Sequence, residues 1–152
     1  MCCKHIINTS FFTSRAGERF EIRHKTNCRT KNALYLEMCL KCNKEQYVGK
    51  VEVQGTNVCQ RRVNRHRTDI KNSDSIAIDR HFDQPDHDFN RDFRIIVIEE
   101  ISNKNMSKEQ MRNLLIQRED FWIAKLGTLN PRGFNDKLNF RNDNPHSSTP
   151  EL

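Results

Sequence analysis

The sequence lacks the features of a membrane-embedded or secreted protein. None of its apolar runs approaches the roughly 20 residues that a membrane-spanning helix requires, so we expect no membrane partner. The N-terminal residues Met1–Ile7 do not contain the apolar core of a secretory signal. We therefore expect an intracellular, reducing compartment, in which the six cysteines are thiols or metal ligands rather than disulfides.

Apolar residues are few, and internal repeats are missing. Only 35% of the 152 residues are hydrophobic and 30% are charged, which is enough apolar content for one modest core and one domain. No segment repeats, so the chain is not an array of like units. The net charge of +6 favours a polyanionic partner, although an ordinary basic soluble protein would show the same balance.

Composition and patterning divide the chain into four predicted segments. Residues 1–16 show no organising pattern, and we expect a flexible lead-in there. Residues 17–32 are predicted to form a peripheral strand, Glu18–Ile22, and a polar connector. The ordered domain is expected over residues 33–137, and the polar residues 138–152 are expected to form a disordered tail.

Residues 33–49 organise the rest of the domain. They contain two short strand-like runs, each with one tyrosine, separated by a Cys-x-x-Cys tip at Cys39 and Cys42. This pattern predicts two antiparallel strands joined by a hairpin, which would bring Tyr35 and Tyr47 close together. Paired tyrosines on a small sheet can fill a core or take part in chemistry.

A basic helix is predicted to follow, over about residues 57–71. Arg62 and His66 are four residues apart and therefore share one face of it. A cationic helix face is often only solvated surface, and it can also bind a polyanion. Four further cations in and before this helix are candidate nucleic-acid contacts: Lys50, Arg61, Arg65 and Arg67.

Two later elements complete the predicted domain. The β-branched run Phe93–Ile101 predicts the most buried strand. A helix is predicted from the capping box Ser107–Gln110 to Gly127. Glu119 falls on the apolar stripe of this helix, where burying an unpaired carboxylate would cost several kcal/mol. It therefore needs an arginine, hydrogen-bonding neighbours or a metal ion as compensation.

Two sheet tyrosines, Arg62 with His66, and an inward Glu119 are the groups that phosphodiester hydrolysis needs. A tyrosine can act as a general base, or orient one, for the attacking water. An arginine can stabilise the charge that grows on the phosphoryl oxygens. One carboxylate can hold a single Mg²⁺ that keeps most of its water shell.

With these residues in place, the chain resembles the GIY-YIG endonucleases. The resemblance implies an α/β (α+β) nuclease fold, with a small, mainly antiparallel three-stranded sheet flanked by helices. It also implies a metal-dependent endonuclease that acts on double-stranded DNA with Mg²⁺ or Mn²⁺, and a nuclear location. The matching motifs occur in the family's order over about residues 33–135: Ala33-Leu34-Tyr35, Tyr47-Val48-Gly49, Arg62 with His66, Glu119 to Ile123, and Asn135.

The resemblance implies a role for each matched residue. Tyr35 would act as the general base or orient the water, with Tyr47 beside it. Gly49 would let the backbone or the substrate approach closely. Arg62 would stabilise the transition state, and His66 would hydrogen-bond to a phosphate or to a tyrosine.

The later motifs would complete the site. Glu119 would bind the divalent metal ion, and Asn135 would help to hold the site together. The segment between the second tyrosine motif and the arginine is a few residues longer than in the family. Either a loop over residues 52–57 absorbs an insertion, or Arg61 is the working arginine. We favour Arg62, because it keeps the four-residue spacing to the histidine.

The likeness is closer to the GIY-YIG domains of Penelope-like retroelements and their free-standing animal relatives, which carry a Cys-x-x-Cys between the tyrosine motifs. Cys39 and Cys42, with His81 and His87, would form a structural Cys2His2 zinc site. Two free thiols and two surface histidines are the plainer alternative. Two other residues could replace one of the histidines: His66 or Cys28.

Two other functions stay open. A domesticated or decayed retroelement copy would bind nucleic acid without cutting it. A zinc-stabilised interaction module would carry a basic helix that is merely solvated. All five catalytic motifs are present, which argues against decay, whereas the longer segment before Arg62 argues for it.

Overall fold

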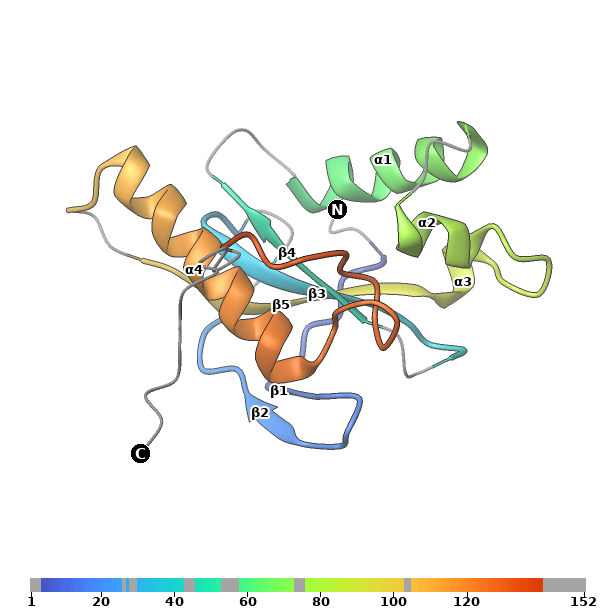
Figure 1. The fold of residues 1–152 in the computed structure, drawn as a ribbon, viewed down its shortest axis with the longest axis horizontal. Helices are drawn as coiled ribbons and strands as arrows, with labels where there is room; N and C mark the ends of the chain where they lie inside the picture. Colours follow the sequence, from blue (N-terminus) through green and yellow to red (C-terminus); the bar gives the residue numbers. More distant parts are fainter. Residues whose placement is uncertain are drawn as a thin grey trace, which may run out of the picture.

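The computed structural model describes residues 4–25, 27, 30–42, 46–52, 58–72, 76–102 and 105–140. The chain has an α+β fold, in which a three-stranded antiparallel sheet is flanked by helices on both faces (Figure 1). This confirms the predicted fold class. The strands lie in the order β4 (Gln46–Val51), β3 (Ala33–Cys39) and β5 (Phe93–Glu100).

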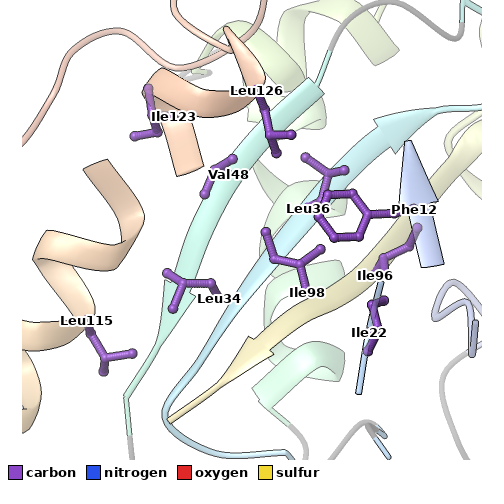
Figure 2. Close-up of a cluster of buried hydrophobic side chains, with 10 residues drawn as sticks. All are labelled: Phe12, Ile22, Leu34, Leu36, Val48, Ile96, Ile98, Leu115, Ile123 and Leu126. Carbon is purple, nitrogen blue, oxygen red and sulfur yellow. The ribbon is translucent and has the colours of Figure 1, made fainter. Parts of the chain in front are cut away.

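One face of the sheet packs on an apolar core. It is covered by α4 (Lys108–Leu126) and by a small hairpin of β1 (Phe11–Thr13) and β2 (Arg19–Glu21). Alternate residues of each strand point to this face, and Figure 2 shows their side chains meeting those of the helix and the hairpin. The core consists of Phe12, Ile22, Leu34, Leu36, Val48, Ile96, Ile98, Leu115, Ile123 and Leu126.

The opposite face of the sheet lies under three helices. These are α1 (Val58–Asn72), α2 (Ala77–Phe82) and α3 (Phe89–Asp92). Residues Val63, Ile78 and Phe82 from the helices pack there against strand residues such as Ile95. The same face receives the side chains of Tyr35 and Glu37, because they alternate with the core residues of β3. It is therefore the face on which the candidate site is built.

The helix α4 begins and ends as its sequence predicts. The Ser107 hydroxyl accepts a hydrogen bond from the Gln110 backbone N–H, and the Gln110 side chain accepts one from the Ser107 N–H, which completes the capping box. At the other end, Gly127 adopts a left-handed conformation with φ 65°. Local chemistry therefore sets both ends of the helix that carries Glu119.

The flexible lead-in predicted over residues 1–16 is wrong for the part that the structure describes. The segment around Ile6 runs parallel to β5 and bridges to Ile95 at the outer edge of the sheet. His5 is buried, and its Nδ1–H donates to the carbonyl of Phe93 over 3.1 Å. Farther along, Phe12 joins the apolar core. These contacts are distant in sequence, so the local pattern could not show them.

Within the predicted strand Glu18–Ile22, the structure has β2 at Arg19–Glu21, which pairs with β1 rather than with the main sheet. The tail predicted to be disordered from residue 138 is docked at its start. The backbone N–H groups of Asn139 and Phe140 donate to the Asp120 carboxylate over 2.7 and 2.9 Å. The loop over residues 53–57 and the tail over residues 141–152 lie outside the described residues.

None of the described helices combines the length and the apolar composition that crossing a membrane would require.

Candidate active site

Two tyrosines and one glycine lie side by side on the β3–β4 ladder. Tyr35 pairs directly with Gly49 across the two strands, and Tyr47 lies two residues before the glycine on the same face. A Cβ at position 49 would lie only 2.4 Å from Cζ and from the phenol oxygen of Tyr35. The close approach that Gly49 permits is therefore made by the tyrosine ring itself. A bulge opposite β5, between Leu34 and Tyr35, adjoins the same spot.

Arg62 of α1 lies over both phenol rings. Its guanidinium carbon is 5.8 Å from the ring centre of Tyr35 and 5.4 Å from that of Tyr47, within cation–π range. The neighbouring Arg61 is exposed. The structure thus places Arg62 rather than Arg61 beside the tyrosines, which is the choice that the sequence favours.

Burial decides the protonation of the two phenols. It raises the pKa of Tyr35 well above its usual range, and the nearby positive charge of Arg62 lowers this pKa only in part. Burial also raises the pKa of Tyr47. Both phenols are therefore protonated at neutral pH, and each can donate one hydrogen bond and accept others.

Glu37, which belongs to none of the matched motifs, lies beneath Arg62. Its carboxylate is 0% exposed, and Oε1 accepts hydrogen bonds from Arg62 Nε over 3.1 Å and from His66 Nε2 over 3.0 Å. Although burial alone would raise the pKa of Glu37, the two cations lower it. A signal was present in the sequence, because Glu37 follows Tyr35 by two residues and therefore shares its face of the strand.

His66 is held between two carboxylates. Its Nε2–H donates to Glu37, and its Nδ1–H donates to Asp79 of α2 over 2.5 Å. Burial opposes a charge on this imidazole, but Glu37 and Asp79 outweigh it and raise the pKa of His66 to about 9. The expected hydrogen bond from His66 to a tyrosine is therefore absent, because both ring nitrogens are occupied by carboxylates.

Glu119 is buried on α4, as its position on the apolar stripe predicts. Its Oε2 accepts from Lys50 Nζ over 2.9 Å and from Asn139 Nδ2 over 2.7 Å. The compensation that this carboxylate needs thus comes from a lysine and an amide. After burial and Glu37, its charge also contributes to the raised pKa of both phenols.

Asn135 closes the free edge of β4. Its Oδ1 accepts from the Val48 backbone N–H, and its Nδ2 donates to the Val48 carbonyl, each over 2.9 Å. The Thr128 hydroxyl donates to the same Oδ1 over 2.7 Å. Because Val48 lies between Tyr47 and Gly49, this side chain fixes the backbone that carries both.

The four candidate nucleic-acid contacts divide into two pairs. Arg61 and Arg65 are exposed on α1. Lys50, in contrast, forms the ion pair with Glu119. Arg67 donates to His5 Nε2 over 3.1 Å and to Asn90 Oδ1 over 2.7 Å. Lys50 and Arg67 are therefore held by other elements of the fold. Arg65 pairs with Asp69 on its own helix over 3.4 Å, but it and Arg61 are exposed and are better placed to meet a polyanion.

Cys39, Cys42, His81 and His87 form a cluster that could hold a metal ion. One ligand atom from each lies within 4.8 Å of all the others. Cys42 Sγ is 3.1 Å from His87 Nε2, while His87 Nδ1 bonds to Asp86 Oδ1 over 2.8 Å. This outer carboxylate orients the ring as the partners of metal-binding histidines do.

Of the two alternative ligands, His66 does not join this cluster. His66 is engaged by Glu37 and Asp79, and Cys28 lies outside the described residues. The four residues first predicted are therefore the set that the fold brings together.

Comparison of the chain with models of protein families, with curated proteins and with solved structures finds no match. The resemblance to GIY-YIG endonucleases therefore stays a prediction. A functional assignment must rest on the residues and the geometry of the site.

Proposed function

We propose that this chain is a metal-dependent DNA endonuclease of the GIY-YIG type. The observation that carries the proposal is the position of Arg62, over two phenol rings and anchored to a buried carboxylate. A fixed cation in a site of low water content stabilises developing negative charge far better than a solvated one does. Phosphodiester hydrolysis develops such charge on the phosphoryl oxygens.

The phenol of Tyr35 would orient the attacking water. Its raised pKa keeps it protonated at neutral pH, so it would accept a hydrogen bond from the water through its oxygen rather than attack as a phenolate. Arg62 would meet the phosphoryl oxygens. Exposed Arg61 and Arg65 would contact the backbone of double-stranded DNA, in keeping with the net charge of +6. A nuclear location would follow from this substrate.

Glu119 would hold the divalent metal ion, Mg²⁺ or Mn²⁺. A carboxylate oxygen suits either ion, and the bound ion would supply Lewis-acid stabilisation of the phosphoryl oxygens. The carboxylate is buried on α4, and its charge acts on both phenols, in keeping with this role.

We further propose that the Cys39, Cys42, His81 and His87 cluster binds a structural Zn²⁺. Two thiolates and two imidazoles match the closed, four-coordinate sites that zinc prefers. Cys39 ends β3 and His81 lies in α2. The ion would therefore tie the tyrosine hairpin to the helix whose Asp79 supports His66.

A plasmid assay tests the nuclease proposal. Purified wild type should nick supercoiled plasmid with Mg²⁺ or Mn²⁺, and Arg62→Ala should reduce the rate by about 100-fold, as loss of a transition-state donor does. Glu119→Ala should abolish the dependence on the metal together with most of the activity. Arg19→Ala is a matched control, because Arg19 also pairs with a glutamate but lies on the peripheral hairpin. It should cut at the wild-type rate.

One observation favours a second function, nucleic-acid binding without cleavage. Lys50 and Asn139 both donate to the Glu119 oxygen that would otherwise be open to a metal ion. In that case wild type and both active-site variants would leave the plasmid equally intact, which would contradict the nuclease proposal. Binding in gel shifts should then weaken steeply as salt rises. DNA binding that does not depend on salt concentration, or no DNA binding, would instead favour an interaction module.

A further inference from the structure

Glu37 places a buried negative charge directly beneath the guanidinium of Arg62. Both bonds to its Oε1 come from cations, Arg62 Nε at 3.1 Å and His66 Nε2 at 3.0 Å. A carboxylate with 0% exposure is costly to bury unless such partners are present. The fold thus buries a carboxylate whose desolvation is unfavourable and pairs it with two cationic side chains.

The contact belongs to a chain of four charged side chains that crosses three elements. Asp79 of α2 bonds to His66 of α1, His66 bonds to Glu37 of β3, and Glu37 bonds to Arg62 of α1. Asp79, His66 and Glu37 have side chains that are at most 2% exposed, whereas that of Arg62 is 17% exposed. Only the last member of the chain is therefore partly open to solvent.

The pairing is not arranged for the greatest stability. Within the described part of the chain, Glu37 Oε2 and Arg62 Nη2 are buried without a hydrogen-bond partner. A buried ion pair with unsatisfied atoms is often no more stable than apolar residues of the same size. What the arrangement does provide is a single orientation for the guanidinium, since its Nε is held from below while its plane lies near both phenol rings.

We propose that Glu37 is a positioning residue of the candidate active site, whose carboxylate fixes the Arg62 guanidinium over Tyr35 and Tyr47 in the orientation that phosphodiester cleavage uses. The inference rests on the proposed nuclease function. Glu37 touches no substrate in this role and acts through Arg62. Asp79 and His66 hold Glu37 in turn, so the orientation is transmitted from α2 to the site.

Two substitutions of Glu37 test the proposal with plasmid DNA and Mg²⁺. Glu37→Gln keeps the size and an accepting oxygen but removes the charge. Glu37→Asp keeps the charge and draws it back by one methylene, about 1.5 Å, and a displacement of about 1 Å in a positioning group can cost about 100-fold in rate. We expect kcat to fall at least about tenfold in both variants, with KM for DNA within about threefold of wild type.

The matched control is Glu99→Gln. Glu99 is a partly buried carboxylate on the neighbouring strand β5, and it accepts from Arg118 Nε over 2.9 Å and from Trp122 Nε1 over 2.7 Å. It therefore resembles Glu37 in charge and in accepting from an arginine, but its side chain is 25% exposed and it faces α4, on the side of the sheet opposite the tyrosines. Its kcat should stay within about twofold of wild type.

A double-variant cycle shows whether Glu37 acts through Arg62. In the Arg62→Lys background the side chain has no Nε–H for Glu37 to hold, so adding Glu37→Gln should change kcat by less than about twofold. A purely structural role for Glu37 would instead give the same loss in both backgrounds. Equal losses would overturn the proposal.

Folding and activity of the wild type separate the remaining outcomes. Circular dichroism and thermal unfolding identify any variant that fails to fold, and if Glu37→Gln unfolds, Glu37→Asp decides. An active wild type whose kcat is unchanged by the folded Glu37 variants overturns the positioning role but not the nuclease. A folded, metal-supplied wild type that cuts no DNA contradicts the nuclease proposal, and the positioning role falls with it.

Discussion

At the scale of single residues, the candidate site depends on the absence of a side chain at Gly49. The ring of Tyr35 occupies the space that a Cβ at position 49 would fill, and the separations of 2.4 Å to Cζ and to the phenol oxygen are far below a normal contact. Gly49 therefore lets the ring pack directly against the backbone of β4. The same placement brings the ring under Arg62, 5.8 Å from its guanidinium carbon.

We predict that Gly49→Ala displaces the Tyr35 ring. DNA cleavage should slow at least about tenfold, and the free energy of unfolding should fall by about 1–3 kcal/mol, as overpacking of a tight site does. Plasmid nicking and urea denaturation measure the two effects. A variant that cuts at the wild-type rate would show that the position of the ring does not matter.

Gly127→Ala is the control for this substitution. Nothing lies within 4 Å of a Cβ at position 127, but its φ of 65° is unfavourable for alanine. We expect a loss of about 1–2 kcal/mol in stability with no change in the cleavage rate. The pair of variants thus separates backbone strain from displacement of the ring.

The residues of the site could be predicted where one element carries them, and not where several do. Helical spacing placed Arg62 and His66 on one face of α1 and Glu119 on the inner face of α4. The partners of His66 come instead from β3 and α2, which are 29 and 13 residues away in sequence. Spacing along a helix carries no information about such contacts, so Glu37 and Asp79 were missed.

At the scale of secondary-structure elements, the Cys/His cluster joins the end of the tyrosine hairpin to α2 and to the loop that follows it. Cys39 and Cys42 lie at the end of β3 and in the turn after it, and His81 lies in α2. His87 follows in the turn before α3. A metal ion held by all four would brace the hairpin that carries the tyrosines against the helix that carries Asp79.

We predict that the purified protein holds one zinc ion, which Cys42→Ser loses. Loss of a structural metal should lower the midpoint of thermal unfolding by at least about 10 °C, because at this chain length each kcal/mol corresponds to about 2–4 °C. Native mass spectrometry and thermal melts measure both. His24→Gln, outside the cluster, should keep its zinc. Wild-type protein without zinc would remove the assignment.

Element boundaries were predictable where local chemistry sets them. The capping box at Ser107 and the glycine at 127 mark the two ends of α4, and both signals are visible in the sequence. The bridge of Ile6 to Ile95 and the docking of Asn139 on Asp120 have no such local signal. Pairing with a sheet edge or a helix side depends on the assembled fold, so these segments were expected to be flexible or disordered.

At the scale of the whole molecule, the sheet lies between α4 on one face and α1 and α2 on the other (Figure 1), and the charged network lies on the second face. The face under α4 is packed with aliphatic and aromatic side chains, whose burial does not change with pH. The face under α1 and α2 holds the charged groups Glu37, Arg62, His66 and Asp79. Any dependence of stability on pH near neutrality should therefore arise mainly on this second face.

His66 determines whether stability rises or falls with pH. Its pKa is raised from 6.5 to about 9 in the folded protein, because Glu37 and Asp79 outweigh burial and the repulsion from Arg62. A raised pKa contributes stability that is fully present below pH 6.5 and is lost as the pH rises through 9. With about 1.4 kcal/mol for each pKa unit, the loss should be on the order of 3 kcal/mol.

Urea denaturation of the metal-loaded protein from pH 6 to 10 measures this loss. Subtracting the curve of His66→Gln removes the contributions of groups that do not depend on His66. The difference in free energy of unfolding between wild type and variant should decline steadily over this interval. A difference that does not change with pH would mean that His66 is uncharged in the folded protein. The imidazole could then donate to only one of its two carboxylates, and the chain from Asp79 to Arg62 would be broken at that point.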